Sequence, residues 1–66
     1  MELRNYLITK KISITNLAKK LGIKKQTVSS QIKYWENGGQ PTLKTVILWS
    51  KALNITKENF ISLISK

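Results

Sequence analysis

Apolar residues recur along this chain with the three- and four-residue spacing of amphipathic α-helices. The spacing predicts helices over about residues 2–10, 14–21, 24–36 and 43–53, and a short fifth helix that contains residues 60–64. One loop rich in turn residues, 37–41, separates the third and fourth helices. The pattern therefore predicts an all-α fold, a compact domain of five helices.

Residue types at the predicted helix ends agree with these boundaries. Ser13, Thr42 and Thr56 stand where an N-cap hydroxyl would accept a hydrogen bond from the first turn. Gly22 and Asn54 stand where a helix commonly ends in a left-handed residue. The third helix begins near residues 24–25, where the sequence offers no capping side chain.

The segment 17–36 contains the most specific arrangement. Its first helix has an apolar stripe, made of Leu17, Ala18 and Leu21. The turn that follows contains Gly22 and Ile23. Isoleucine is a residue type that is usually buried, so we expect Ile23 to pack inward. The second helix has its own stripe, made of Val28, Ile32 and Trp35. Two short helices joined by a glycine turn, the second with long polar side chains opposite its stripe, are typical of a helix-turn-helix.

Composition limits the functional classes. The 66 residues form one domain, 1–66, which contains neither cysteine nor histidine. The three acids, Glu2, Glu36 and Glu58, are scattered along the chain. Acid–base and nucleophilic catalysis mostly requires His, Cys or paired carboxylates, so we expect no enzyme, no metal site and no cofactor.

The net charge of +9 indicates a polyanionic partner, because self-repulsion of this size destabilises a small domain. No apolar run approaches the ~20 residues of a membrane span. The first residues lack the basic-then-apolar pattern of a signal peptide. We expect a cytoplasmic protein, at a bacterial nucleoid or in a virus-infected host cell, with no membrane and no small-molecule ligand.

The motifs LAKKLGIKKQTVS, WENG, QPTL and SKALNIT together resemble the Cro/CI-type (XRE-like) helix-turn-helix family of phages and mobile elements. The resemblance extends from Leu3 to Phe60. It implies a lambda-repressor-like domain that binds double-stranded DNA as a homodimer, usually at a palindromic operator, to repress a promoter. Its most specific parts are Leu17 and Ala18 with Leu21–Ile23, and Glu36–Gly38 with Pro41 and Leu43.

Three positions depart from the family pattern. The third helix is about four residues longer, which is one helical turn and keeps its apolar face in phase. Ile14 stands where the family often has a glutamine that grips a phosphate. Leu7 stands where the family has the arginine that pairs with the glutamate here numbered Glu36, and Arg4, one turn earlier, is the candidate replacement.

By the resemblance, the base-reading residues are Lys25, Gln26, Ser29 and Ser30. Their chemistry suits base edges, since lysine donates to guanine, glutamine pairs with adenine and serine serves several bases. Gln31 and Lys33, in the additional turn, would extend the footprint or contact the backbone. The alternative interpretation is that these residues are only the solvent-exposed face of a helix and do not contact DNA.

Candidate phosphate contacts surround this helix. A lysine at a helix N-terminus opposes the macrodipole, and a bound phosphate would explain its presence there. The candidates are Lys24, Thr27, Lys33, Asn37, Gly38 and Lys44. Lys19 and Lys20 lie on the outer face of helix two, where the sequence leaves open a solubilising role or a phosphate contact.

Aromatic and apolar residues near the C-terminus predict a dimer. Trp35 and Tyr6 fit the core, whereas Tyr34 falls off the apolar face and would be exposed. The remaining apolar surface of helices four and five exceeds what one small domain buries, which usually marks an interface. The predicted dimer interface is Trp49, Phe60, Ile61 and Ile64, and burial of Trp49 in the monomer remains the alternative for that residue.

The sequence thus predicts a homodimeric repressor of a phage or mobile element, with helix three, about residues 25–36, in the major groove. A restriction–modification controller or an antitoxin fits the same pattern. The alternative from another class is a protein-binding module or inhibitor that keeps the fold without specific DNA binding. Non-specific binding to RNA or to an anionic membrane is the third interpretation.

Overall fold

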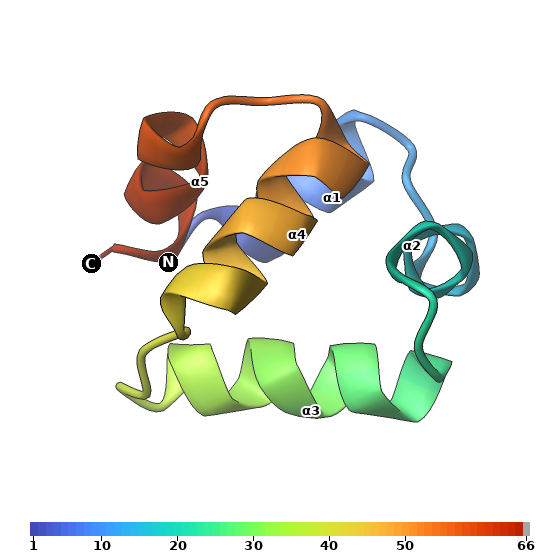
Figure 1. The fold of residues 1–66 in the computed structure, drawn as a ribbon, viewed down its shortest axis with the longest axis horizontal. Helices are drawn as coiled ribbons and strands as arrows, with labels where there is room; N and C mark the ends of the chain where they lie inside the picture. The colour runs from blue at the N-terminus through green and yellow to red at the C-terminus, as the bar shows by residue number, and fades with distance from the viewer. Residues whose placement is uncertain (66) are drawn as a thin grey trace.

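The computed structural model describes residues 1–65 and shows the all-α domain that the apolar spacing predicts (Figure 1). Its five helices are α1 (Leu3–Thr9), α2 (Ile14–Leu21), α3 (Lys25–Glu36), α4 (Leu43–Leu53) and α5 (Lys57–Ile64). All five lie where the sequence predicts them, so the helix count, the order and the approximate boundaries are confirmed.

Hydroxyl side chains begin three helices, as predicted. Ser13, Thr42 and Thr56 each accept a hydrogen bond from the backbone N–H three residues later, at 3.1, 3.2 and 3.1 Å. These N–H groups have no partner within the helix, so each cap contributes roughly 1 kcal/mol. The start of α3, at Lys24, lacks a side-chain cap, which also agrees with the sequence.

Four helices end on the same backbone turn. In each, a residue with positive φ follows the helix, and the N–H after it donates to a carbonyl five positions earlier, at 2.8 to 3.1 Å. The four positive-φ residues are Lys11, Gly22, Gly38 and Asn54, with φ of 57°, 72°, 97° and 58°. Gly22 and Asn54 were predicted as left-handed ends, whereas Lys11 was not.

Three aromatic rings from three helices form the centre of the core. Trp35 of α3 and Trp49 of α4 pack edge to face with ring centroids 4.8 Å apart, and Phe60 of α5 lies 5.8 and 5.9 Å from them. Such pairs are stabilising beyond the area that they bury. The trio joins α3, α4 and α5, and the predicted core role of Trp35 is confirmed.

The two ends of the described chain lie side by side. The backbone N–H of Glu2 donates to the carbonyl of Leu63 at 2.8 Å, which ties the start of α1 to α5 (Figure 1). Tyr6 packs half-buried against the core. The contact therefore joins α1 to α5, which the aromatic trio packs against α3 and α4.

Two apolar residues lie outside the core, contrary to the sequence pattern. The spacing of the fourth helix predicts an apolar stripe of Leu43, Val46, Ile47, Ser50 and Leu53. Leu43 is nevertheless 71% exposed, because it lies in the first turn, where α4 leaves the loop. Ile23, in the turn between α2 and α3, is 37% exposed. The core side of α4 is formed instead by Val46, Trp49, Ser50 and Leu53.

Candidate nucleic-acid interface

The helix-turn-helix is formed by α2 and α3 with residues 22–24 between them. Gly22 adopts φ 72° and ψ 29°, and the N–H of Ile23 donates to the carbonyl of Ala18 at 3.1 Å. Glycine adopts this conformation without steric cost. The turn brings Leu17 and Val28, both fully buried, into one core beneath the two helices. The structure thus has the layout that the sequence predicts.

The two sides of α3 have opposite characters. Its inner side is fixed in the core by Val28, Ile32 and Trp35, all buried. Its outer side is exposed along the whole helix, which runs along one edge of the molecule (Figure 1). The predicted base-reading residues Lys25, Gln26, Ser29 and Ser30 and the predicted phosphate residues Lys24, Thr27 and Lys33 are all exposed. The structure therefore brings the predicted contact residues of α3 together on one accessible surface.

Gln31 is not part of this surface. Its side-chain oxygen accepts a hydrogen bond from the indole N–H of Trp49 at 3.1 Å, and the residue is half-buried. The expectation that Gln31 extends the footprint is therefore corrected. A buried indole N–H requires a partner, and Gln31 is the nearest one on α3.

The additional turn of α3 is helical, because the helix continues without interruption for 12 residues from Lys25 to Glu36. Lys33 and Tyr34 occupy this extension, and Tyr34 is 60% exposed, as predicted. The ring of Tyr34 lies over the backbone of Gly39, so close that a Cβ at Gly39 would overlap it. The Gly39 N–H also donates to the Tyr34 carbonyl at 2.8 Å.

The remaining phosphate candidates flank the C-terminal end of α3. Asn37 and Gly38 are exposed in the loop, and Lys44 is exposed in the first turn of α4. Gly38 has φ 97°, a backbone conformation that other residues rarely adopt. This loop and the start of α4 therefore place Lys44 and two exposed loop residues beyond the C-terminal end of α3, although the N–H groups of Asn37 and Gly38 already donate to carbonyls of α3.

An ion pair fixes the end of α3. The guanidinium group of Arg4 donates two hydrogen bonds to Glu36, from Nε to Oε2 at 2.8 Å and from Nη2 to Oε1 at 3.1 Å. The candidate pairing of Arg4 with Glu36 is thus confirmed. These hydrogen bonds, and more weakly the charge of the guanidinium, hold the pKa of the Glu36 carboxyl below its ordinary value.

The predicted dimer residues divide into two groups. Trp49 and Phe60 are 1% and 0% exposed in the centre of the monomer core, where a partner protomer cannot reach them. The prediction that they form a dimer interface is therefore wrong. For Trp49 the alternative prediction, burial in the monomer core, is correct. Ile61 is 48% exposed and Ile64 is half-buried, so both remain accessible.

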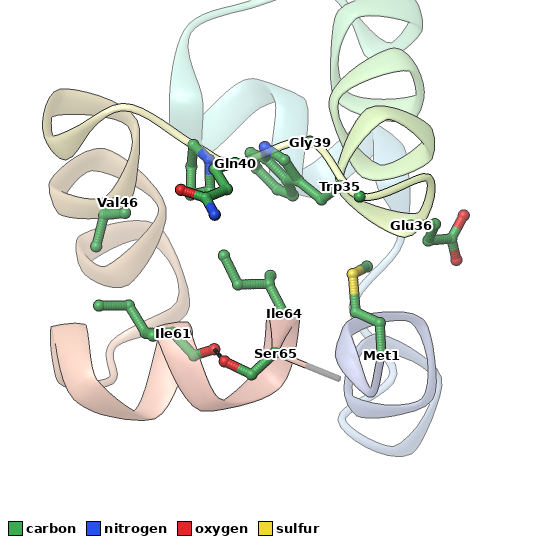
Figure 2. A pocket seen from close by; sticks show the side chains of 11 residues that line it. Met1, Trp35, Glu36, Gly39, Gln40, Val46, Ile61, Ile64 and Ser65 are labelled. Atoms are coloured by element: carbon green, nitrogen blue, oxygen red, sulfur yellow. Dashed lines mark hydrogen bonds between the residues drawn. The ribbon is translucent and has the colours of Figure 1, made fainter.

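Ile61 and Ile64 border an open groove of about 830 Å³ (Figure 2). The groove lies between α5, the start of α4, the 37–41 loop and Met1. Figure 2 shows Ile64 between Gln40 and Met1. Val46, from α4, and Ile61, from α5, lie near each other on the other side of Ile64. The described lining combines apolar side chains with Glu36, Gln40 and Ser65 and contains no lysine, which distinguishes this groove from the lysine-rich surface of α3.

The described residues contain neither a metal cluster nor a membrane-spanning helix. Within residues 1–65, no group of three or more His, Cys, Asp or Glu side chains is placed to hold a metal ion. No described helix is long and apolar enough to cross a membrane.

Sequence comparison agrees with this geometry. A family model described as helix-turn-helix matches residues 3–60, from the first residue of α1 to the buried phenylalanine of α5. No curated protein and no solved structure matches the chain. The match includes both helices of the turn, the 37–41 loop and all three core aromatics. The chain belongs to the XRE-type helix-turn-helix family of DNA-binding regulators.

Proposed function

We propose that this protein is a transcriptional repressor of a phage or mobile element that binds a palindromic operator as a homodimer. The observation that supports it most is the exposed side of α3, where Lys25, Gln26, Ser29 and Ser30 stand opposite a fully anchored apolar side. A rigid helix with hydrogen-bonding side chains on its free side fits the major groove, where every base pair presents a distinct pattern.

The base-reading residues act near the N-terminal end of α3. Gln26 makes a bidentate pair with adenine, Lys25 donates to guanine, and Ser29 or Ser30 contacts a neighbouring base. Lys33 lies seven residues after Gln26, about 10 Å further along the helix axis. It therefore contacts the phosphate backbone beyond the bases that Gln26 reads.

Phosphate contacts orient the domain on the duplex. These contacts hold the two DNA strands that flank the bases read by α3. They come from Lys24, Thr27 and Lys33 of the α3 segment and from Asn37, Gly38 and Lys44 beyond it. Three of these residues are lysines, and each phosphate neutralised contributes about −0.9 to the slope of log affinity against log salt. A dimer with six such lysine contacts has an expected slope of about −5.

The second protomer covers Ile61 and Ile64 beside the groove of Figure 2. A two-fold contact through α5 leaves the N-terminal part of both α3 helices free, because α5 lies away from that end of α3 (Figure 1). The same symmetry requires an operator with two half-sites.

Selection of duplexes from a random pool at physiological salt tests this function. We expect a palindromic consensus with half-site centres about 10 base pairs, one helical turn, apart. An Ile61→Glu variant should select single half-sites, since it buries an unpaired charge in the dimer contact. Absence of any enriched sequence would contradict the proposal and favour a protein-binding module with the same fold.

A further inference from the structure

A second basic surface lies outside the α3 interface. A hollow of about 390 Å³ opens between the α1–α2 turn and the outer face of α2. It is lined by Lys11, Ile12, Asn16, Lys19 and Lys20. We call it the lysine hollow. Its three amines and one amide are hydrogen-bond donors of the kind that contact DNA phosphates.

No acid balances this charge. The one ion pair within residues 1–65 is that of Arg4 with Glu36, and neither residue lines the hollow. Lys20 also borders a neighbouring hollow with Lys51, at the C-terminal end of α4. Lys20 is therefore shared by the two hollows, the second of which is also lined by Leu21, Leu48 and Ala52.

The lysine at position 11 is itself unusual. It has φ 57°, whereas the other three helix ends of this type carry glycine or asparagine. Those two residues tolerate the left-handed conformation better than lysine does. A requirement for positive charge at this place explains a lysine that the backbone geometry disfavours.

The position of the lysine hollow decides which DNA it reaches. Figure 1 shows the α1–α2 turn, which contributes Lys11 and Ile12, on the side of the molecule away from α3, with α2, which contributes Lys19 and Lys20, between this turn and α3. The domain measures 25 × 22 × 20 Å. A straight duplex seated on the outer side of α3 therefore lies across the domain from this turn.

We infer that the lysine hollow binds the phosphate backbone of a second DNA duplex, so that the protein bridges two segments. This inference rests on the proposed binding of a first duplex through α3, but it concerns a separate surface. The recognition is electrostatic and independent of sequence, because only phosphates meet the three lysines.

A capture experiment with the full chain tests the bridge. An immobilised operator duplex is loaded with protein, the bound protein is quantified, and retention of a labelled unrelated duplex is then measured. Lys20→Glu reverses a charge in the hollow, and Lys57→Glu makes the same charge change in the first turn of α5, outside it. Lys11→Asn removes a charge while relieving the left-handed backbone, so it preserves the fold.

At equal loading, we expect wild type and Lys57→Glu to retain the second duplex alike. Lys20→Glu should retain about tenfold less, and Lys11→Asn several-fold less. Equal retention by Lys20→Glu and wild type, or equal loss in Lys57→Glu, would overturn the inference.

Two further outcomes distinguish the bridge from a failure of the first binding event and from binding of flanking DNA. Failure of wild type to load the first duplex would remove the proposed function, and the bridge with it. The second outcome concerns the length of the immobilised duplex. If wild type binds longer duplexes more tightly, Lys20→Glu does not, and no second duplex is captured, the hollow contacts flanking DNA of the same duplex. That result would overturn the bridge.

Discussion

Arg4 and Glu36 form a two-bonded ion pair that ties the first turn of α1 to the last residue of α3, with an Nε–Oε2 distance of 2.8 Å. The arginine comes one turn earlier in α1 than the family pattern places it, and its guanidinium group still contacts the carboxylate. This pair fixes the end of α3 that the additional turn extends.

The pair predicts a specific pH dependence of stability. Because the pKa of Glu36 in the folded protein lies below its ordinary value, the pair stabilises the fold fully above that ordinary value, and this contribution is lost as the pH falls through the folded pKa. Glu36→Gln should therefore melt below wild type near pH 7, and the two melting temperatures should converge in acid. The control Glu58→Gln removes the carboxylate of an exposed residue in α5. A constant difference between Glu36→Gln and wild type from neutral to acid would contradict the role of the pair.

The Gln31–Trp49 hydrogen bond predicts a stability loss without loss of volume. Gln31→Met keeps the side-chain size but leaves the buried indole N–H of Trp49 unpaired, at an expected cost of about 1–3 kcal/mol. Chemical denaturation followed by tryptophan fluorescence measures it. Gln31→Glu retains an acceptor and should lose less. Equal losses in the two variants would show that packing, and not the hydrogen bond, is responsible.

The left-handed conformation of Lys11 predicts that Lys11→Gly stabilises the protein. Glycine relieves the positive φ of 57°, and the expected gain is about 1 kcal/mol, reduced by the greater freedom of glycine in the unfolded chain. The matched control is Lys10→Gly, since Lys10 has φ −84° and should gain nothing. Thermal denaturation of both variants compares them. A loss of stability in Lys11→Gly equal to that in Lys10→Gly would contradict the geometry.

Gly39 and Tyr34 are expected to be energetically coupled. A Cβ at position 39 overlaps the Tyr34 ring, so Gly39→Ala should displace the ring, whereas the same change after Tyr34→Ala should meet open space. A double-mutant cycle of unfolding free energies should give a coupling of about 0.5–1 kcal/mol. Gly38→Ala provides the contrast, because its cost arises from φ 97° and should not depend on Tyr34. A coupling of zero between positions 34 and 39 would show that the ring moves freely.

The sequence predicts most of this fold because its local signals agree. Hydroxyl caps, left-handed ends and apolar stripes each mark the same boundaries, and the stripe of α3 continues through the additional turn with Ile32 and Trp35. The left-handed Lys11 was missed, although an isoleucine follows it just as one follows Gly22 and Asn54. That shared pattern is the signal that could have identified it.

The errors arise where one segment offers two apolar faces. From Val46 to Trp49, α4 carries four apolar residues in a row, so spacing alone does not decide which ones face inward. Contact with α3 and α5 buries Trp49, leaves Leu48 47% exposed and exposes Leu43. Gln31 was placed on the DNA side for a similar reason, since only the position of Trp49 reveals its partner.

The central claim is that α3 reads bases while the surrounding lysines hold phosphates, and one comparison tests it most directly. Gln26→Ala and Lys44→Ala are each measured by titration on the selected operator and on a scrambled duplex at one salt concentration. We expect Gln26→Ala to lose about 1–3 kcal/mol of binding free energy on the operator and little on the scrambled duplex, whereas Lys44→Ala should weaken binding to both alike. Equal losses on the two duplexes for Gln26→Ala would contradict base reading by α3.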